Sequence, residues 1–407
     1  MLLAIAFLGL GARLYRDADR YKREDFKRYY AEARLLSDGG DPWRVQVPRP
    51  SEIPRPATTP PRQIGYPPAF YLMLSPLSRF QPAPAHLIWE ALQFASLIFA
   101  LLIALTEIGA GAAGNFARGA FAFAFLFPPL QSALHWGQPT PMLLLLLVAS
   151  WSCARRGRDI PAGILLAAAT LLKVFPWTVA GYFLFRRRWT VITSAILSGL
   201  AASGGLVVLY GIHRTVEFLR GAQASAFWLD RTRNLSIIGN LHWLLSQMAG
   251  QAPATVLFGV SGAAVCASFL VFSGRLTSTF RDKSPATDGL CWSLWVLLSI
   301  LLSPVAWDHY LTLLIPMYIF LAWRLFASSN ESPGQGNSTW PWIGPILIAG
   351  GLTGFLIAPY FAAARHMRCY MILALASYAG LSLMLRQYDG AVAIRRRRAS
   401  ADQAMVS

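Results

Sequence analysis

The fold is decided by apolar stretches such as residues 85–106, which read AHLIWEALQFASLIFALLIALT and contain one charged residue, Glu90. A helix of about 20 apolar residues crosses the roughly 30 Å of hydrocarbon in a bilayer. Runs of similar character recur near 118–134, 190–210, 253–272, 289–306, 310–326, 341–362 and 369–385. The sequence therefore predicts an all-α integral membrane protein.

Three shorter apolar runs, at 139–153, 160–173 and 174–185, are interrupted by Pro141, Pro161 and Pro176. Broken helices of this kind are permitted in a membrane only where neighbouring protein or water satisfies the backbone. If Met1–Ala12 is the visible part of a first span, the sequence predicts a bundle of about twelve crossings. Composition agrees, because 55% hydrophobic and 14% charged residues with a mean hydropathy of +0.44 exclude an ordinary soluble domain.

The net charge of +17 comes mostly from loops that follow even-numbered spans. These basic segments are Arg155–Arg158, Arg186–Arg188, the Arg275–Lys283 loop and the tail Arg395–Arg398. Cationic loops stay in the cytoplasm, so we expect the four to lie there together, with 391–407 as a basic cytoplasmic tail. The first loop, 17–68, carries acids as well as cations, and long loops escape the rule, so we place it outside. Nucleic acid is the weaker interpretation because the cations have no aromatic interleaving.

The segment Glu24–Tyr30, of sequence EDFKRYY, sets a carboxylate among cations and aromatics just after the first apolar segment. In a helix, Asp25, Tyr29 and Glu32 share one face because they stand at i, i+4 and i+7. A different surface is then formed by Phe26 and Tyr30. Two interpretations of Asp25 remain open from these residues: a functional carboxylate, or the N-cap of a surface helix that stops at the following Gly-Gly turn.

Further polar residues lie at the outer ends of apolar runs. Tyr66 precedes the segment Ala69–Phe80, which is too short to span and is better interpreted as interfacial or re-entrant. Tyr66 then either anchors the chain at the membrane interface or stacks on a sugar ring. Trp136 and Gln138 belong to a turn between two runs, and are also residue types that stack on and hydrogen-bond to carbohydrate.

Lys173 is a lone cation between apolar stretches, which either snorkels to the interface or meets an anion. Asp308 and His309 stand side by side in an apolar stretch, where they form either a structural turn or part of a site that faces a ligand. A second outer excursion, 211–252, contains Arg233, Asn240 and His242. The cysteines, at positions 153, 266, 291 and 369, have no paired spacing and are interpreted as core residues.

Taken in chain order, these segments resemble the bacterial family of polytopic glycosyltransferases related to the polyprenyl-phosphate-mannose-dependent α-1,2-mannosyltransferases. The resemblance is carried by Asp25-Phe-Lys-Arg-Tyr-Tyr-Ala, Gly40-Asp-Pro, Tyr66-Pro-Pro-Ala-Phe, Trp136-Gly-Gln-Pro-Thr, Leu172-Lys-Val-Phe-Pro and Ser303-Pro-Val-Ala-Trp-Asp-His-Tyr. It extends to about residue 386 and implies a GT-C architecture, a helical membrane bundle whose first outer loop carries the catalytic aspartate, here Asp25. The chain departs from the family in its short first segment and in Trp43.

The resemblance implies a single membrane domain, 1–390, that moves a mannose-like hexose from a polyprenyl-phosphate donor to a glycolipid or glycan acceptor. The site is then expected at the outer face of the cell (inner) membrane, with inversion and with Asp25 as general base. The donor phosphate is expected to meet Lys173, His309, Arg28 and Arg233, and the substrates to meet Tyr29, Tyr66, Trp136, Gln138, Asn240, His242 and Asp308. No P-loop or zinc motif occurs, so we expect no cofactor and no metal.

A transporter or flippase of lipid-linked sugars is the alternative function, and an inactive membrane scaffold is a third. A transporter would show corresponding broken helices in two related halves, with charges near the bilayer midplane. The sequence contains no internal repeat, and its polar patches gather at one face. Both observations favour the enzyme.

Overall fold

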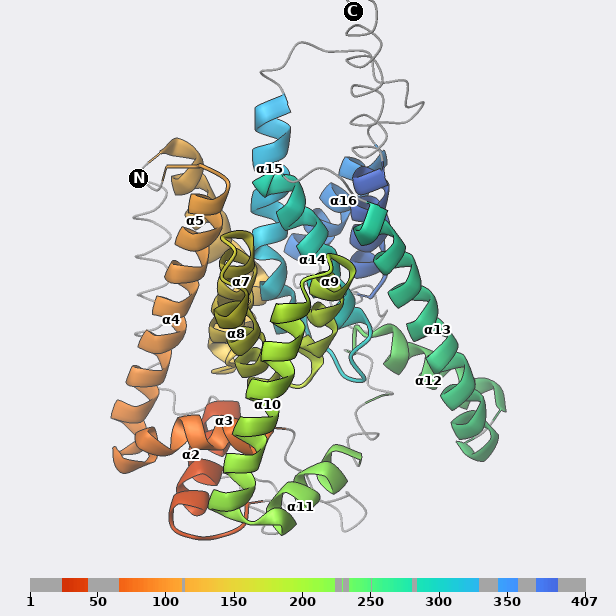
Figure 1. The fold of residues 1–407 in the computed structure, drawn as a ribbon. Coiled ribbons are helices and arrows are strands. Elements are labelled where there is room, and N and C mark those ends of the chain that lie inside the picture. Colours follow the sequence, from red (N-terminus) through yellow and green to blue (C-terminus); the bar gives the residue numbers. More distant parts are fainter. Residues whose placement is uncertain are drawn as a thin grey trace, which may run out of the picture.

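The computed structural model describes residues 24–42, 66–111, 114–223, 229, 234–249, 251–279, 284–328, 343–357 and 371–386. Within these ranges all regular secondary structure is helical (Figure 1). The all-α prediction is therefore confirmed for this part of the chain. The first apolar segment, most of the loop 17–68, Arg233 and the tail 391–407 lie outside the described residues.

The body of the molecule is a bundle of helices that surround a central one, α14 (Pro285–Leu301), whose residues Ala286–Leu301 are all buried. The others in the bundle are α4 (Pro82–Glu107), α5 (Asn115–Leu126), α6 (Pro128–His135), α7 (Thr140–Arg155), α8 (Asp159–Leu172), η2 (Phe175–Val179), α9 (Ala180–Phe185), α10 (Trp189–Tyr210), α13 (Gln251–Thr279), η4 (Asp308–Leu314), α15 (Ile315–Ser328), α16 (Ile343–Ile357) and a helix at Met371–Arg386. The core of the protein is formed where these helices pack around α14.

Four stretches of described helix are long and apolar enough to cross a membrane: Pro82–Glu107, Trp189–Tyr210, Phe258–Thr279 and Asp308–Phe326. Shorter apolar helices accompany them, so the predicted number of about twelve crossings is not confirmed. The expected single run at 118–134 is instead two helices, α5 and α6. They separate at Phe127 because the consecutive Pro128 and Pro129 can begin a helix but cannot continue one.

Three short helices gather at one end of the bundle: α2 (Glu24–Ser37), α3 (Pro68–Leu74) with the adjoining η1 (Ser75–Arg79), and α11 (Ile212–Gln223) (Figure 1). The prediction that 69–80 does not span is confirmed. α2 ends at Ser37, and Gly39, two residues later, has a φ of +82°. Arg214 of α11 donates to the carbonyl oxygen of that glycine over 2.9 Å, so α11 is attached to the end of α2.

The two faces predicted for α2 are confirmed. Phe26 packs against Trp89 of α4, with ring centroids 6.1 Å apart, and the Tyr30 hydroxyl donates to the carbonyl oxygen of Phe80 over 2.7 Å. On the other face, the Tyr71 hydroxyl donates to Glu32 over 2.7 Å. α2 is thus fixed to both α4 and the α3–η1 segment.

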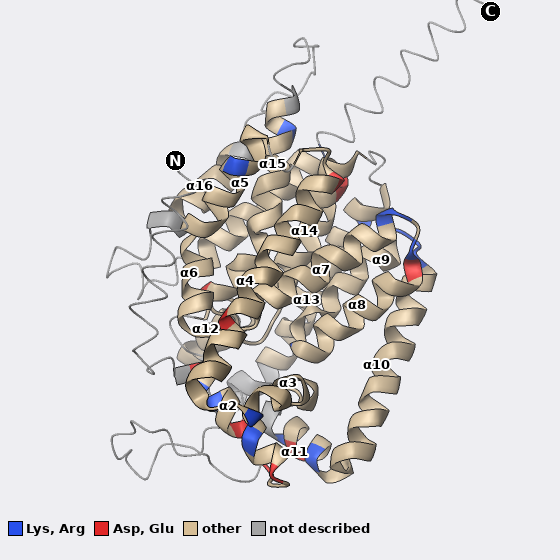
Figure 2. Ribbon diagram, turned by 90° about the vertical axis from the view of Figure 1, so that its left-hand side faces the viewer, with Lys and Arg blue, Asp and Glu red and all other residues tan. Residues whose placement is uncertain are grey.

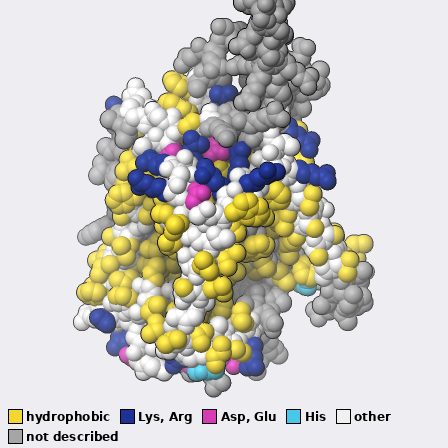
Figure 3. Space-filling view, viewed as in Figure 1, with side chains coloured by type: hydrophobic (Ala, Val, Ile, Leu, Met, Phe, Trp, Pro, Cys, Tyr) yellow, Lys and Arg dark blue, Asp and Glu magenta, His cyan; other side chains and the backbone are white. Residues whose placement is uncertain are grey.

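The basic loops after α7 and α9 meet at the opposite end, as predicted (Figures 2 and 3). The buried Asp288 of α14 lies 3.0 Å from Arg155 Nη1 and 2.8 Å from Arg186 Nη2, and Glu107 of α4 lies 2.7 Å from Arg156 Nε. Between this band of arginines and the α2 end, the surface is largely apolar (Figure 3). An apolar belt between two polar ends is the surface expected of a membrane protein.

Candidate active site

Asp25 lies in the first turn of α2 and is held there by a residue far away in sequence. Gln138 Nε2 donates to Asp25 Oδ2 over 2.7 Å and to the Tyr29 hydroxyl over 2.9 Å. Gln138 itself is buried. α2 is described from Glu24, so Asp25 is its second described residue, and its carboxylate has a tertiary partner in Gln138.

Gln138 reaches α2 because of the turn that joins α6 to α7. Gly137 in this turn has a φ of +65°, a backbone conformation that glycine adopts without steric cost. A Cβ at this position would stand 2.8 Å from the Cβ of Phe26. The Trp89 indole donates to the Gly137 carbonyl over 2.9 Å and fixes the turn. Only a glycine therefore lets the turn approach α2 this closely.

The other end of the same amide faces a cation. Lys173 Nζ donates to Gln138 Oε1 over 3.2 Å, and the Tyr66 hydroxyl donates to this oxygen over 2.7 Å. Tyr29 donates to Tyr66 over 3.0 Å and closes the ring of hydrogen bonds. One buried amide thus joins a carboxylate on α2 to an ammonium group that follows α8.

Lys173 stands in the break between α8 and η2, where Pro176 prevents the helix from continuing. Its ammonium lies 4.0 Å from the ring centroid of Tyr310, and the Phe175 ring stacks on Tyr310 with ring centroids 4.8 Å apart. Burial lowers the pKa of Lys173 to about 7, although the charge of Asp25 acts in the opposite direction. The lysine is thus a buried cation on an aromatic platform and is not a snorkelling surface residue.

His309 adjoins this platform, with its ring centroid 4.9 Å from that of Tyr310. It is buried, and its Nε2 has no hydrogen-bond partner among the described residues. Its Nδ1 lies 3.8 Å from Asp308, whose side chain is 43% exposed. A buried nitrogen without a partner is costly unless a ligand or water supplies one, so His309 is available to a substrate oxygen.

Arg28 is one turn along α2 from Asp25, and its Nε lies 3.2 Å from Glu32 Oε1. Burial raises the pKa of Glu32, and Arg28 opposes that shift. The Tyr71 hydroxyl holds the other carboxylate oxygen. Arg28 therefore brings positive charge close to the site while it is paired with a buried acid.

The remaining predicted residues make their contacts elsewhere. Trp136 packs against His135, and His242 packs against Phe258. Asn240 donates to backbone carbonyl oxygens at the start of α12 (Ile237–Ala249), a helix that Figure 1 shows well apart from α2. Arg233 lies outside the described residues. The structure therefore gathers Asp25, Tyr29, Tyr66, Gln138, Lys173 and His309, but does not bring Trp136, Asn240 or His242 into contact with them.

Two residues of the cluster, Tyr310 and Gly137, are not among the site residues predicted from the sequence. Both stand inside segments that carry the family resemblance, and Tyr310 directly follows His309. Their roles depend on which distant residue faces them, so the local sequence gave no signal of either. Among the described residues, no group of three or more His, Cys, Asp or Glu side chains is placed to hold a metal ion.

Comparison with known proteins assigns more than half of the chain to a family. Residues 65–304 match the model of Glycosyltransferase family 87. The chain is 27% identical over 287 residues to a "polyprenol-phosphate-mannose-dependent alpha-(1-2)-phosphatidylinositol pentamannoside mannosyltransferase" of Mycobacterium tuberculosis (strain CDC 1551 / Oshkosh). The aligned residues are 70% of this chain and 63% of that protein. A Mycolicibacterium smegmatis protein of the same description is 25% identical over 291 residues, which are 71% of this chain and 67% of that one.

The chain thus spans about two thirds of the length of these relatives. Among solved structures, ArnT from Cupriavidus metallidurans bound to undecaprenyl phosphate aligns with 90% of this chain and 73% of its own. The TM-score is 0.42 at 14% identity, which is too distant a likeness to argue from.

Proposed function

The chain belongs to glycosyltransferase family 87, and from this premise we propose that it moves a hexose from a polyprenyl-phosphate donor to a glycolipid or glycan acceptor. The mycobacterial relatives carry names that specify polyprenol-phosphate-mannose, so mannose is the first sugar to test. The membrane fold suits such a donor, because its lipid tail stays in the apolar belt while the sugar and phosphate reach the polar end.

The proposed reaction is a single displacement. An acceptor hydroxyl attacks the anomeric carbon, the bond from that carbon to the phosphate oxygen breaks, and the electron pair leaves with the phosphate. Asp25 takes the hydroxyl proton as general base. Lys173 and His309 stabilise the charge that develops on the leaving phosphate, and Arg28 adds positive charge nearby. Because one displacement occurs, the anomeric configuration is inverted.

The observation that carries this proposal is the shared amide of Gln138. It holds Asp25 at one end and Lys173 at the other, within 2.7 and 3.2 Å. A base and a cation must stand on opposite sides of the same reacting carbon, and this cluster is the place where the described residues put a carboxylate and a buried ammonium group within reach of one substrate.

The site lies at the end opposite the basic loops. Since cationic loops are retained in the cytoplasm, we place the site at the outer face of the cell (inner) membrane. The excursions 17–68 and 211–252 then border it, and the attachment of α11 to the end of α2 supports a shared role in holding the acceptor. We retain one domain, 1–390, of GT-C architecture, followed by the cytoplasmic tail 391–407.

Replacement of Asp25 tests the proposal. Asp25→Asn keeps the shape of the side chain but removes the proton acceptor, so transfer from polyprenyl-phosphate-mannose should fall by about 10²–10⁴-fold. Expression and the melting temperature should stay near those of the wild type. Asp38→Asn is the matched control, because Asp38 lies at the other end of α2 with its side chain 72% exposed.

An active Asp25→Asn enzyme would contradict the base assignment, and Asp308 would be the next carboxylate to test. Chelation separates this mechanism from a metal-dependent one. EDTA should leave most of the wild-type rate, whereas loss of activity that Mg²⁺ or Mn²⁺ restores would show that a metal takes part.

A further inference from the structure

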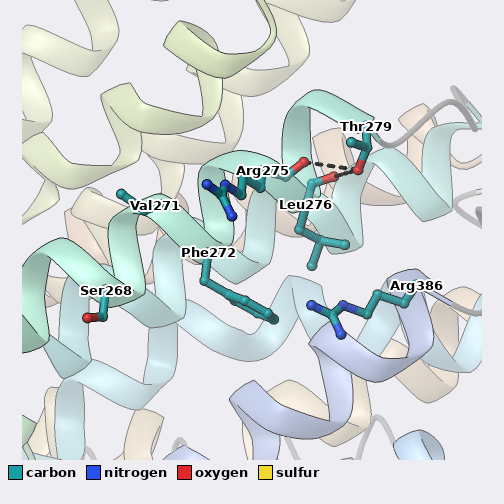
Figure 4. Close-up of a pocket in the computed structure, with 7 residues that line it drawn as sticks. All are labelled: Ser268, Val271, Phe272, Arg275, Leu276, Thr279 and Arg386. Atoms are coloured by element: carbon teal, nitrogen blue, oxygen red, sulfur yellow. Dashed lines mark hydrogen bonds between the residues drawn. The ribbon is translucent and has the colours of Figure 1, made fainter.

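A groove of about 440 Å³ lies between α13 and the helix Met371–Arg386 (Figure 4). It is at the basic end of the molecule, far from Asp25, so the proposed transfer reaction does not use it. In Figure 4 the side chains of Phe272 and Leu276 on α13 point toward Arg386 on the facing helix. Arg275 and Thr279 line the groove on the α13 side. The groove thus combines an apolar floor with two guanidinium groups.

The two arginines differ from the paired arginines at this end. Arg155 and Arg186 both contact the buried Asp288. Among the described residues, no ion pair joins Arg275 or Arg386 to a carboxylate, and no acidic side chain lines the groove. The guanidinium carbon of Arg386 instead lies 4.8 Å from the ring centroid of Phe272, which holds it over the apolar floor. Within the part of the chain that the structure describes, these two charges thus have no carboxylate partner.

The position of Arg275 near the end of the apolar stretch of α13 indicates what kind of anion fits the groove. Arg275 stands four residues before the end of the apolar stretch Phe258–Thr279, which is long enough to cross a membrane. The apolar floor continues from it along α13 to Val271, which is 51% exposed. A ligand that fills such a groove carries negative charge at the membrane interface and a hydrocarbon chain directed toward the bilayer interior.

We propose that this groove binds an anionic phospholipid. The phosphate contacts Arg386, whose fork of donors suits it, Arg275 adds positive charge from the α13 side of the groove, and an acyl chain lies on Phe272 and Leu276. The Thr279 hydroxyl already donates to the carbonyl oxygen of Arg275 over 2.9 Å, so the two arginines supply the charge that attracts the anion. Inorganic phosphate shares the headgroup chemistry but lacks the chain, so the two can be distinguished.

The test uses the purified, delipidated full chain in detergent. Phosphatidylglycerol, phosphatidylcholine or inorganic phosphate is added, bound lipid is counted by native mass spectrometry, and melting is followed in parallel. Phosphatidylglycerol should remain bound and raise the melting temperature, whereas the other two should not. The double variant Arg275→Gln/Arg386→Gln should bind phosphatidylglycerol about tenfold or more weakly, because charge-assisted hydrogen bonds to phosphate are lost.

The control is the double variant Arg158→Gln/Arg187→Gln. It removes the same charge from exposed positions at the same end of the molecule and should bind phosphatidylglycerol as the wild type does. Equal loss in both double variants would show non-specific charge attraction and overturn the proposal. Unchanged binding in Arg275→Gln/Arg386→Gln would overturn it as well, as would equal stabilisation by inorganic phosphate. Melting in phosphatidylcholine checks that each variant is folded.

Discussion

Gln138 uses both ends of its amide, and each end faces a group of opposite charge. Its Nε2 donates to Asp25 and Tyr29, and its Oε1 accepts from Lys173 and Tyr66. A carboxylate and an ammonium group that met directly would neutralise each other as an ion pair. With the amide between them, each has a fixed position without a direct ion pair, so we propose that Gln138 acts as a positioning residue.

Gln138→Met tests this role because methionine has a similar length but neither donates nor accepts as an amide does. Asp25 and Lys173 would lose a shared partner, and a misplaced catalytic group commonly costs about 10²-fold in rate. Steady-state kinetics should show the loss in kcat, with a smaller change in KM. Gln131→Met on α6 is the control and should keep kcat. If Gln138→Met raised only KM, the residue would be a substrate contact instead.

Lys173 predicts a pH dependence of the reaction. Burial brings its pKa down to about 7, so the cation is complete below that pH and is lost as pH rises through it, earlier than for an exposed lysine. Neutral lysine cannot stabilise the leaving phosphate, so kcat/KM, which reports the free enzyme, should fall above about pH 7. Lys173→Arg should lack this fall because arginine stays protonated. A wild-type profile that is flat through this range would contradict the assignment.

At the scale of elements, the α6–α7 turn is what brings two distant parts of the chain together. Its Gly137 has a positive φ and leaves no room for a Cβ beside Phe26. The break between α8 and η2 likewise places Lys173 next to Gln138. A turn between helices thus supplies Gln138, which contacts Asp25, and a break between helices supplies Lys173, which contacts Gln138.

Gly137→Ala separates backbone strain from displacement of α2. Gly157, in the α7–α8 turn, has a φ of +73° and nothing within 4 Å of an added Cβ, so Gly157→Ala carries the strain alone. Both variants should lose stability, by about 1–2 kcal/mol for the left-handed conformation. Only Gly137→Ala should also push α2 away, and its transfer rate should fall by about 10²-fold. Comparable rates in the two variants, measured beside their melting curves, would show that close contact at Gly137 is not needed.

The sequence predicted those features that depend on local pattern. The faces of α2, the short α3–η1 segment and the position of Lys173 between apolar runs all follow from spacing and composition. It did not predict that Gln138 contacts Asp25, 113 residues earlier, because pairing across that separation depends on tertiary packing. The contact between Lys173 and Tyr310 was not predicted either, because it too depends on tertiary packing. The sequence predicted one apolar run at 118–134 because its residues are almost all apolar. Pro128 and Pro129 divide that run into α5 and α6.

At the scale of the whole molecule, the two ends are chemically different. One carries paired arginines, and the other carries α2, which contains Asp25, together with α3 and α11 (Figure 2). α10 runs between the ends, and only 11% of its most apolar stretch is buried, so most of this helix is exposed, as expected of a helix that faces lipid. The Asp25 cluster thus lies toward one end of the bundle only.

The corresponding prediction concerns topology and is tested in a chain whose native cysteines have been replaced. Asp38→Cys lies at the site end and Arg158→Cys in the basic loop after α7, and both positions are exposed. Because cationic loops are retained in the cytoplasm, a membrane-impermeant thiol reagent should label Asp38→Cys in intact cells, or in spheroplasts if there is an outer membrane. It should label Arg158→Cys only after the membrane is permeabilised. Labelling of Arg158→Cys alone in intact cells would invert the orientation and move Asp25 to the cytoplasmic face, where the donor would have to be presented from the opposite leaflet.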